Sequence, residues 1–363
     1  MKVRVGIGAL VGIVGGPATY ARELVAALVR RGGHDYVVFT DQPEVFRHLG
    51  VETVEVPLPT PYHQVTWDHW RLPGLVVRAR VSVYHGTKNV LPWRLPIPTV
   101  VTVHDLAVYA HPRSFSWGQR WHLRLLLPRS VATAARVITP SAHARDDVLA
   151  RFRAAAGRTR SIPHGVGAQW LAPPPAAMVA AFRVRHALGE RLIACVGTLQ
   201  PRKHAERVIE AFVRSEVARA GWELVIAGRL RPGHAPAWLR ALPPHVRWLG
   251  PLSDDDLRAL YAAAPIAMSA SEYEGFGLVL TEAMASGSAV IAVATSAVPE
   301  VVGDAGCLVT RSDATLLADA LAHLAAEPER RAALGVRARA RAASFTWDEA
   351  ARRTREVYDE VRG

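Results

Sequence analysis

The sequence predicts an α/β protein built from two doubly wound, Rossmann-like domains that face each other across a central cleft. Short β-branched runs alternate with stretches whose apolar residues recur at helical spacing. The alternation occurs in two series, and a Gly- and Pro-rich segment at residues 165–175 lies between them. Such alternation is typical of parallel sheets with right-handed crossovers. We therefore expect domains at residues 1–168 and 169–345, followed by a helix at residues 346–363.

The first series predicts six strands, with helices expected at residues 20–31 and 117–135 among the connections. The strands are expected at residues 3–7, 36–40, 53–56, 81–85, 99–103 and 137–139. Ligands of doubly wound sheets bind at the carboxyl ends of the strands. The residues that follow these strands are therefore the first candidates for a functional site.

The second series predicts six more strands and a closing helix. The strands are expected at residues 192–196, 223–227, 246–249, 266–269, 289–294 and 307–309. Thr346 is a suitable N-cap for the last helix, because Asp348 and Glu349 then occupy its positively polarised first turn.

The charge of the chain is concentrated in its first half. Residues 1–170 hold 21 Lys/Arg and 10 Asp/Glu, a net charge of +11, whereas residues 171–363 hold 23 and 22, a net charge of +1. A basic half favours a polyanionic partner, an anionic membrane surface or a phosphorylated acceptor, and a solvated Arg-rich surface is the alternative. Because 41 of the 44 basic residues are Arg, Lys203 stands out as one of only three lysines.

Cysteine usage and hydropathy indicate a reducing, cytoplasmic compartment. Cys195 and Cys307 each stand alone in an apolar run, as reduced core residues do. Residues 5–21 are uncharged, but their glycines favour a strand followed by a glycine loop over a signal peptide. The uncharged run at residues 283–299 is shorter than the ~20 apolar residues of a membrane-spanning helix.

The most informative stretch is residues 271–287, which follows an expected strand. Its two glycines, Gly275 and Gly277, let backbone approach a ligand closely, and a helix is expected from about Leu278. Free amides at that helix start suit a diphosphate. Glu274 and Glu282 could accept hydroxyl groups of a sugar and of a ribose, although a capping and a surface glutamate would have the same spacing.

This stretch resembles the signature of glycosyltransferase family 4, which comprises retaining enzymes of the two-domain GT-B fold. The resemblance implies that Glu274 is the catalytic carboxylate over the transferred hexose and that Glu282 binds the ribose. Ala270 and Val279 depart from the family pattern, which often has Pro at these positions. The loop residues implied in binding the phosphate and sugar of the donor are Gly275, Phe276, Gly277 and Leu278.

Residues 196–204 resemble the family variant Gly-Thr-Leu-Glu-Pro-Arg-Lys-Asn, with His204 in place of Asn. A departing nucleoside diphosphate gains negative charge, which positioned cations stabilise. The resemblance implies this role for Lys203 and Arg202. Thr198, expected to contact the donor, stands where many members have Arg, and a solvated loop is the alternative interpretation. The Pro-Arg-Lys variant is similar to mannosyltransferases of surface polysaccharides, so GDP-mannose is the first donor to consider.

Two first-domain motifs also resemble the family. His104, with Asp105 beside it at a strand end, is implied to reach the donor sugar as a catalytic residue, and a hydrogen-bonded core histidine is the alternative. Gly15 and Gly16 resemble the first glycine loop, near the diphosphate and the acceptor. A dinucleotide fingerprint is the competing interpretation of the N-terminal glycines, but Gly6, Gly8 and Gly12 lack the usual spacing. The remaining landmarks lie at residues 140–145, 163–166, 299–305 and 345–347.

The resemblance extends over nearly the whole chain and implies that the final helix crosses back onto the first domain. It also implies that no metal or other cofactor is required. Asp254 and Asp256 mimic the metal-binding Asp-x-Asp of a different fold, but Ser253 before them predicts a helix cap. Residues 113–136 form a basic segment with tryptophans, which suits either a membrane surface or a half-buried helix.

We therefore expect a cytoplasmic retaining hexosyltransferase whose acceptor is a glycan, a lipid-linked sugar or a natural product. A nucleotide sugar is the expected donor, and peripheral contact with the inner face of the cell membrane is a further expectation. One alternative is a nucleotide-sugar epimerase of the same fold. The other is a basic protein that binds nucleic acid or anionic membrane and keeps a non-catalytic sugar site; nucleic acid is the less favoured of these partners.

Overall fold

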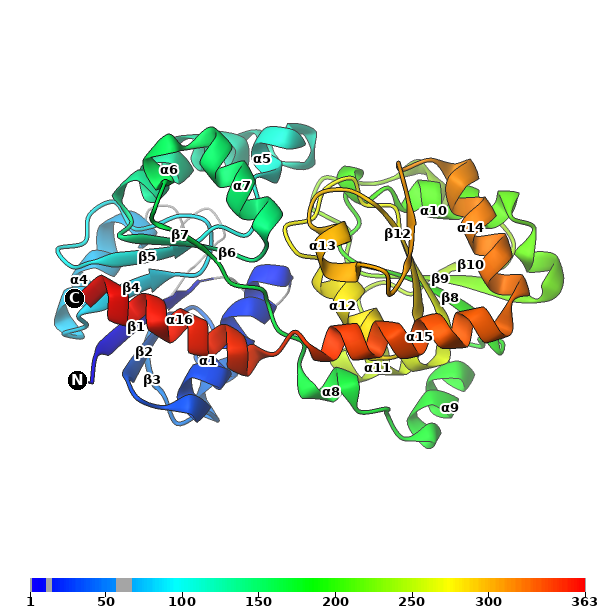
Figure 1. Ribbon diagram of the computed structural model, residues 1–363, viewed down its shortest axis with the longest axis horizontal. Helices are drawn as coiled ribbons and strands as arrows, with labels where there is room; N and C mark the ends of the chain where they lie inside the picture. Colours follow the sequence, from blue (N-terminus) through cyan, green and yellow to red (C-terminus); the bar gives the residue numbers. More distant parts are fainter. Residues whose placement is uncertain (1, 11–14, 57–66, 363) are drawn as a thin grey trace. The chain divides into compact units, whose positions relative to one another are not determined.

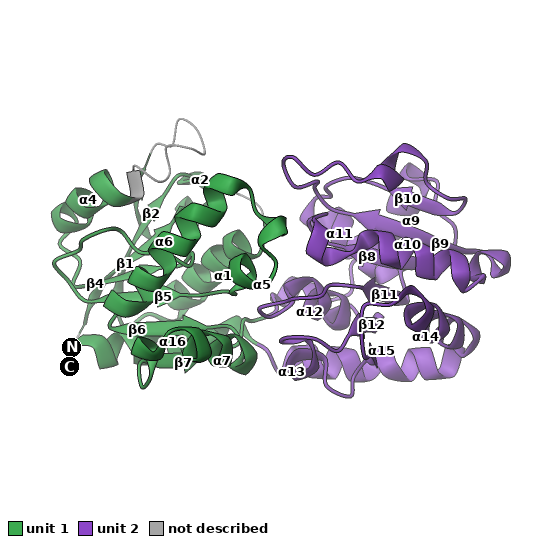
Figure 2. Cartoon of the chain, turned by 90° about the horizontal axis from the view of Figure 1, so that it is seen from above, with its two compact units in different colours: residues 1–165, 346–363 green, residues 166–345 purple. Residues whose placement is uncertain are grey.

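The computed structural model describes residues 2–10, 15–56 and 67–362 (Figure 1). The chain divides into two compact units, which Figure 2 shows in different colours. Unit 1 comprises residues 1–165 and 346–363, and unit 2 comprises residues 166–345. Within the described parts of the chain, no helix is both long enough and apolar enough to span a bilayer.

Unit 1 contains a parallel seven-stranded sheet in the order β3-β2-β1-β4-β5-β6-β7. The strand order reverses between β1 and β4, which is the point where doubly wound sheets bind ligands. The strands are β1 (Arg4–Ala9), β2 (Asp35–Thr40), β3 (Glu52–Glu55), β4 (Val83–Gly86), β5 (Thr99–Thr102), β6 (Arg136–Thr139) and β7 (Thr159–Ser161). Six of them match the expected strands within a few residues, and β7 was not expected.

The helices of unit 1 connect and cover this sheet. On one face, Leu127 and Val131 of α6 and Val148 of α7 pack with the strand residues Val101 and Val137 in one apolar cluster. The final helix, α16 (Trp347–Arg362), packs against α1 within the same unit (Figure 1). The other helical segments are α1 (Gly16–Arg31), α2 (Glu44–Arg47), η1 (Trp67–Arg71), α4 (Leu72–Arg78), α5 (Ala107–Ala110), η2 (Pro112–Ser114), α6 (Trp117–Thr133), α7 (Ala142–Arg151) and η3 (Arg153–Ala155).

Unit 2 contains a parallel six-stranded sheet in the order β10-β9-β8-β11-β12-β13, with its reversal between β8 and β11. The strands are β8 (Arg191–Val196), β9 (Trp222–Ala227), β10 (Val246–Trp248), β11 (Ile266–Ser269), β12 (Ala289–Val293) and β13 (Cys307–Val309). All six were expected from the sequence. The prediction of two doubly wound α/β domains is therefore confirmed.

Helices cover both faces of this second sheet. Along β8, Leu192 and Ala194 belong to one buried cluster, whereas Ile193 and Cys195 belong to the other. This alternation follows from the pleat, which turns successive side chains to opposite faces. The helical segments are α8 (Ala168–Leu171), α9 (Ala176–Arg185), η4 (Pro201–Lys203), α10 (Ala205–Arg214), η5 (Val217–Ala220), η6 (Ala237–Arg240), α11 (Asp254–Ala263), α12 (Leu278–Ala285), α13 (Val298–Val302), α14 (Ala314–Ala326) and α15 (Pro328–Ala343).

Both predicted helix caps are present. The Ser253 hydroxyl accepts a hydrogen bond of 3.1 Å from the Asp256 amide, so the aspartates lie in the first turn of α11. The Asp256 carboxylate pairs with Arg185 at 2.7 Å. At the other helix, the Thr346 hydroxyl accepts from the Glu349 amide at 3.1 Å. The Asp-x-Asp at residues 254–256 is therefore a capping motif at a helix start, as the sequence predicted.

Candidate active site

The candidate site of unit 2 lies after two adjacent strands at the point where the strand order reverses. The loop after β8 forms the short helix η4, which ends at Lys203. The loop after β11 carries Glu274 and leads into α12. Because both strands are parallel and neighbouring, their carboxyl ends bring these loops together at one edge of the sheet.

Glu274 is a buried carboxylate held between two cations. Its residue is only 6% exposed. The Lys203 ammonium donates a hydrogen bond to Glu274 Oε1, and an Arg202 guanidinium nitrogen lies 3.8 Å from Oε2. Arg202 also donates to the carbonyl of Tyr273, so the two loops are joined through side chains and backbone. The result is a three-membered charge cluster with one negative and two positive groups.

Backbone contacts hold Glu274 in this position. Its amide donates to the Ser296 hydroxyl at 2.7 Å, and the Glu272 amide donates to the Arg202 carbonyl at 2.9 Å. The Ser271 hydroxyl accompanies them by donating to the Tyr273 carbonyl at 3.3 Å. These contacts fix the loop that carries the carboxylate, as pre-organised sites require.

Electrostatics keep the Glu274 carboxyl ionised. Burial alone would raise its pKa, but the charges of Lys203 and Arg202 and hydrogen bonds from Lys203 and Ser271 outweigh burial and lower it. Nearby, Arg231 donates to the Gln200 side chain at 3.0 Å. Burial and the positive charge of Arg202 lower the pKa of Arg231. Arg231 therefore adds a third cation to this end of the sheet.

His204 lies between two glutamates, beside the cluster of Glu274, Lys203 and Arg202. Its Nδ1 lies 2.7 Å from Glu206 and its Nε2 lies 3.0 Å from Glu272. The hydrogen bond with Glu206 contributes most to raising the pKa of His204, burial opposes it, and Glu272 reinforces it. His204 has a left-handed backbone, with φ of 46°, and forms the N-cap position of α10.

The start of α12 presents backbone rather than side chains. Gly277, with φ of 100°, occupies the N-cap position in the left-handed region, which glycine tolerates best. The first amides of a helix have no partner within it and suit an anion. The Phe276 ring is buried and meets Phe345 edge to face at 5.5 Å between ring centroids. Leu278 begins the helix, and Gly275 precedes this turn.

Glu282 lies farther along α12 and is half-buried. Its negative charge, after burial, contributes to raising the pKa of Tyr261, whose hydroxyl donates to the Val279 carbonyl at 3.0 Å. On the other side of the site, Thr198 is exposed in the loop after β8. Gly197 and Gly228 pack backbone to backbone there, since a Cβ on Gly228 would lie 1.9 Å from the Gly197 carbonyl oxygen.

In unit 1, the predicted residues lie at the start of α1 and just after β5. Gly15, with φ of 107°, forms the N-cap position of α1, and Gly16 is its first residue. His104 is buried beyond β5, where its amide donates to the Asn89 side chain at 2.8 Å. Gly12, part of the competing dinucleotide pattern, lies outside the described residues.

Comparison with known proteins identifies the family. A sequence model described as Glycosyltransferase Family 4 matches residues 14–170, and one described as Glycosyl transferases group 1 matches residues 180–341. The chain belongs to the family 4 glycosyltransferases. Neither the epimerase nor the non-catalytic binding protein is favoured by these matches.

Several curated relatives of this glycosyltransferase are mannosyltransferases. The O-antigen chain mannosyltransferase B of Escherichia coli is 26% identical, in a match that covers 76% of this chain and 74% of that protein. The MMP alpha-(1->4)-mannosyltransferase of Mycolicibacterium hassiacum is 32% identical, with 67% and 58% covered. The GDP-mannose-dependent alpha-(1-6)-phosphatidylinositol monomannoside mannosyltransferase of Mycobacterium tuberculosis is 28% identical, with 92% of each chain covered.

Solved structures confirm the GT-B fold. Anabaena HepE, in complex with UDP and glucose, matches with a TM-score of 0.79 and 18% identity, over 99% of this chain and 100% of that one. WaaG, a glycosyltransferase of lipopolysaccharide biosynthesis, matches with a TM-score of 0.77 and 18% identity, over 99% and 100% of the two chains.

The His104 ring of this glycosyltransferase is fixed by hydrogen bonds within unit 1. Its Nε2 lies 2.7 Å from the Thr87 carbonyl, which only accepts, so Nε2 carries a proton. Its Nδ1 lies 3.3 Å from Nε2 of His164. Burial lowers the pKa of both imidazoles, so the pair is neutral. His164 must then donate to His104.

A second buried chain of hydrogen bonds supports this pair. The Tyr20 hydroxyl lies 2.9 Å from the Thr102 hydroxyl, which lies 2.7 Å from His85 Nε2. His85 Nδ1 lies 2.7 Å from the Tyr358 hydroxyl of α16. The Tyr20 ring meets the His104 ring edge to face at 5.0 Å. The C-terminal helix is thus tied to the carboxyl end of the first sheet.

Sequence reasoning missed three of these contributors. Arg231 follows β9 in a loop without a motif, and His85 looked like an ordinary strand end. His164 belonged to a recognised landmark, but only the folded structure shows it against His104. Position after an expected parallel strand points to Arg231 alone, because His85 lies within β4 and His164 follows β7, which the sequence did not predict.

Proposed function

We propose that this glycosyltransferase moves a hexose from a nucleotide diphosphate sugar to its acceptor with retention of anomeric configuration, and that GDP-mannose is the donor. All three relatives above are named as mannosyltransferases, and one of them is named as GDP-mannose-dependent. The structural neighbour HepE was solved with UDP and glucose, so UDP-glucose is the comparison donor.

The contact of Lys203 and Arg202 with Glu274 carries the proposal. As the glycosidic bond breaks, negative charge grows on the leaving diphosphate, and a positioned Lys/Arg pair stabilises it. Glu274 remains ionised, so it can accept hydroxyl hydrogens of the sugar and stabilise positive charge at the anomeric carbon. Stabilising the leaving diphosphate and contacting the sugar require the two cations and the carboxylate within one small region. The contact of Lys203 with Glu274 meets this requirement.

The surrounding backbone suits the rest of the donor. Amides at Gly275, Phe276, Gly277 and Leu278, at the start of α12, are assigned to the phosphate and the sugar. Glu282 is assigned to the ribose hydroxyls, and Thr198 to the edge of the donor site.

Unit 1 is assigned to the acceptor, with the Gly15–Gly16 turn near the phosphates and His104 near the transferred sugar. Because both ring nitrogens of His104 form hydrogen bonds within unit 1, the carbon atoms of its ring and its backbone carbonyl are the groups that would contact the sugar. A glycan, a lipid-linked sugar or a small natural product would be the acceptor. The donor's own phosphate is proposed to take the acceptor proton on the same face of the sugar.

We also propose that no metal is required, because Arg202, Lys203 and the α12 amides would stabilise the negative charge of the diphosphate in place of a metal cation. Among the described residues, no cluster of three or more His, Cys, Asp or Glu side chains forms a metal site. Transfer in excess EDTA therefore tests this part directly, and loss of activity that Mg²⁺ or Mn²⁺ restores would contradict it.

The test of the function combines binding and turnover. Thermal stabilisation by GDP-mannose, UDP-glucose and a dTDP-sugar identifies the donor, and mass spectrometry and NMR of the product establish the transferred sugar and its anomeric configuration. Lys203→Ala and Glu274→Gln should each lower transfer by about 10²-fold or more. Glu216→Gln, at an exposed pair with Arg219 in the same unit, is the matched control. Full activity in both site variants, or an inverted product, would refute the assignment.

A further inference from the structure

Helix α6 of unit 1 has an exposed apolar stripe that its fold does not use. Trp117, Trp121 and Leu125 are 71%, 62% and 67% exposed. They recur every four residues and therefore share one face of the helix. The two indole rings contact each other edge to face at 6.1 Å. α6 belongs to unit 1, whereas Lys203 and Glu274 of the proposed donor site belong to unit 2.

The opposite side of α6 accounts for its packing in the core. Leu126, Leu127 and Val131 are buried there. A capping box of Ser116 and Gln119 fixes the start of the helix, so Trp117 is its first residue. The helix is therefore apolar on two sides, and only one of these is needed to hold it on the sheet.

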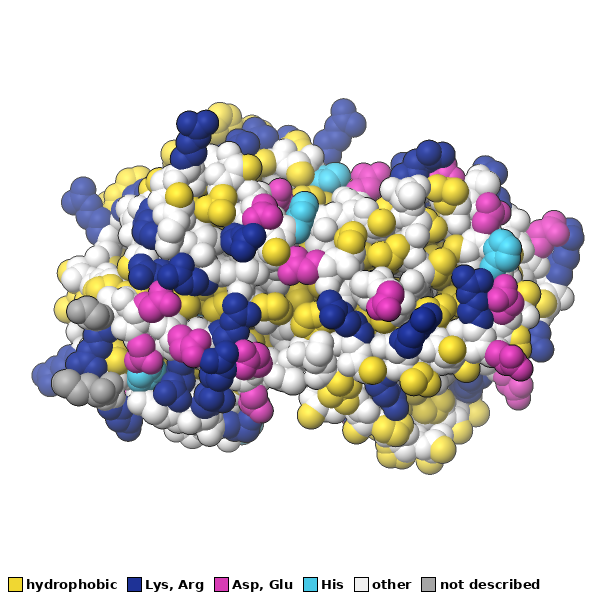
Figure 3. Space-filling model, in the orientation of Figure 1, with side chains coloured by type: hydrophobic (Ala, Val, Ile, Leu, Met, Phe, Trp, Pro, Cys, Tyr) yellow, Lys and Arg dark blue, Asp and Glu magenta, His cyan; other side chains and the backbone are white. Residues whose placement is uncertain are grey.

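The charged side chains of α6 itself are all arginines. Residues 106–145 contain six arginines and no Asp or Glu. Arg120 and Arg124 lie three residues after the two tryptophans and so border the stripe on the helix surface. On the face shown in Figure 3, basic side chains are spread over unit 1, and hydrophobic side chains gather among them along its upper edge, where Figure 1 places α5 and α6.

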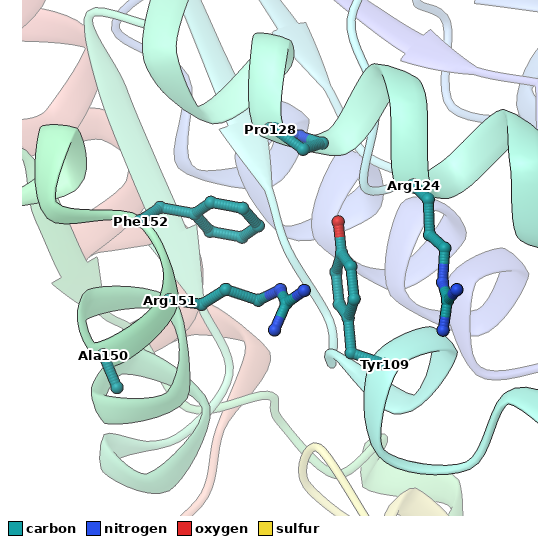
Figure 4. A pocket seen from close by; sticks show the side chains of 6 residues that line it. All are labelled: Tyr109, Arg124, Pro128, Ala150, Arg151 and Phe152. Atoms are coloured by element: carbon teal, nitrogen blue, oxygen red, sulfur yellow. The ribbon is translucent and has the colours of Figure 1, made fainter.

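A cationic hollow adjoins this helix. It has a volume of about 660 Å³ and is open to the surface. Figure 4 shows the Tyr109 ring between the guanidinium groups of Arg124, on α6, and Arg151, on α7. These groups lie 5.9 Å and 3.6 Å from the ring centroid. The buried Tyr109 hydroxyl has no hydrogen-bond partner among the described residues.

We propose that α6 and this hollow dock unit 1 on an anionic phospholipid surface. The tryptophans and Leu125 would enter the interface, where amphipathic rings are favoured. Arg120 and Arg124 would meet the lipid phosphates, and the hollow, which Tyr109, Arg124 and Arg151 line together, would take one headgroup beside the Tyr109 ring. Charge complementarity selects this occupant, because a run of forty residues without a carboxylate fits a negatively charged plane.

The test is vesicle flotation of the full chain, with phosphatidylcholine vesicles compared against vesicles that contain phosphatidylglycerol. Binding is expected only to the anionic vesicles, to weaken with added salt, and to shift tryptophan fluorescence to the blue. The triple change Trp117→Ser, Trp121→Ser and Leu125→Ser should abolish binding. Each arginine near the surface contributes about fivefold in affinity, so Arg124→Glu should weaken binding by at least about that factor.

Matched controls lie on exposed sites of unit 2. Val184→Ser and Val336→Ser remove apolar side chains that are 81% and 72% exposed, and Arg311→Glu reverses an exposed charge. All three should bind vesicles as the unchanged chain does. Thermal stability and nucleotide-sugar binding should be retained in every variant, which separates docking from folding and from donor recognition.

Three outcomes would overturn the proposal. The first is that the anionic vesicles do not bind the unchanged chain at low salt. The second is equal binding by the triple variant. The third is a dimer in solution that the triple variant dissociates while vesicle binding is absent, which would assign the stripe to a second copy of the chain.

Discussion

Removing Lys203 should destabilise unit 2 more than removing both members of the Lys203–Glu274 pair. In Lys203→Met, the buried Glu274 carboxylate keeps Arg202, at 3.8 Å, as its one charged partner among the described residues. Breaking a buried pair from one side costs about 3–5 kcal/mol, because the other charge is left uncompensated. Arg202 and the Ser271 hydroxyl still favour the carboxylate, so we expect about 3 kcal/mol, the lower end of that range.

The double change removes both charges of the Lys203–Glu274 pair. Glu274→Gln alone should cost about 2 kcal/mol, since the Lys203 ammonium then faces a neutral amide in a site that is mostly buried. Lys203→Met combined with Glu274→Gln removes the uncompensated carboxylate, leaves Arg202 hydrogen-bonded to the Tyr273 carbonyl, and keeps both side-chain volumes. Its free energy of unfolding should therefore exceed the value expected from adding the two single losses by about 2–3 kcal/mol, so that it loses no more stability than Lys203→Met does.

The assay is urea denaturation of the four proteins at neutral pH, followed by tryptophan fluorescence, with transfer activity measured in parallel. The double variant should regain stability but not activity, which distinguishes loss of chemistry from loss of fold. Single changes that add within about 0.5 kcal/mol would refute the reasoning, because independent sites behave in that way. Such a result would also show that the Lys203–Glu274 contact is not maintained in solution.

Three further predictions follow from local geometry. His204→Asn keeps a residue type that tolerates a left-handed backbone but loses the ion pairs with Glu206 and Glu272. Because these acidic partners raise the pKa of His204 above 6.5, the stability lost in the variant should be largest below that pH and should vanish as the pH rises through the raised pKa. Denaturation of both proteins at about pH 6 and about pH 9 measures this difference. Thr102→Val leaves the buried Tyr20 hydroxyl and His85 Nε2 without their hydrogen-bond partner and should lower the free energy of unfolding by about 2–4 kcal/mol in chemical denaturation. Tyr36→Phe removes a buried hydroxyl that has no partner among the described residues and should change it by less than about 0.5 kcal/mol. Equal effects of the two changes would contradict the hydrogen-bond network. Gly165→Ala places a Cβ 2.1 Å from the backbone nitrogen of residue 347 and should lower the unfolding free energy by about 3 kcal/mol, while Gly74→Ala, in open space on α4, should be neutral or stabilising by up to about 1 kcal/mol in thermal unfolding.

The sequence predicted the strands that contain apolar residues and missed β7, which contains none. β8 and β11 are continuous buried runs, and the pattern located both. β7 consists of Thr159, Arg160 and Ser161, all half-buried, so it has no hydrophobic signal. Its structure comes from pairing with β6 at the sheet edge, which is a tertiary effect.

The same distinction applies to the candidate site. The sequence places Lys203 and Glu274 after strands, and the rules of parallel sheets bring such loops to one edge. It does not predict that they contact each other, because that depends on the path of two loops and on backbone contacts such as the Glu274 amide with Ser296. The third cation, Arg231, is visible only in the folded structure.

His104 shows most clearly what sequence reasoning leaves open. A histidine after a strand can contact a ligand or be satisfied in the core, and its sequence position is the same in both cases. Hydrogen bonds to Thr87 and His164 use both ring nitrogens, and burial keeps the ring neutral. A neutral ring with both nitrogens engaged is a poor proton donor or acceptor. We therefore expect any part that His104 takes in transfer to be one of shape and position, and we assign the charge chemistry to the Glu274 cluster as a proposal.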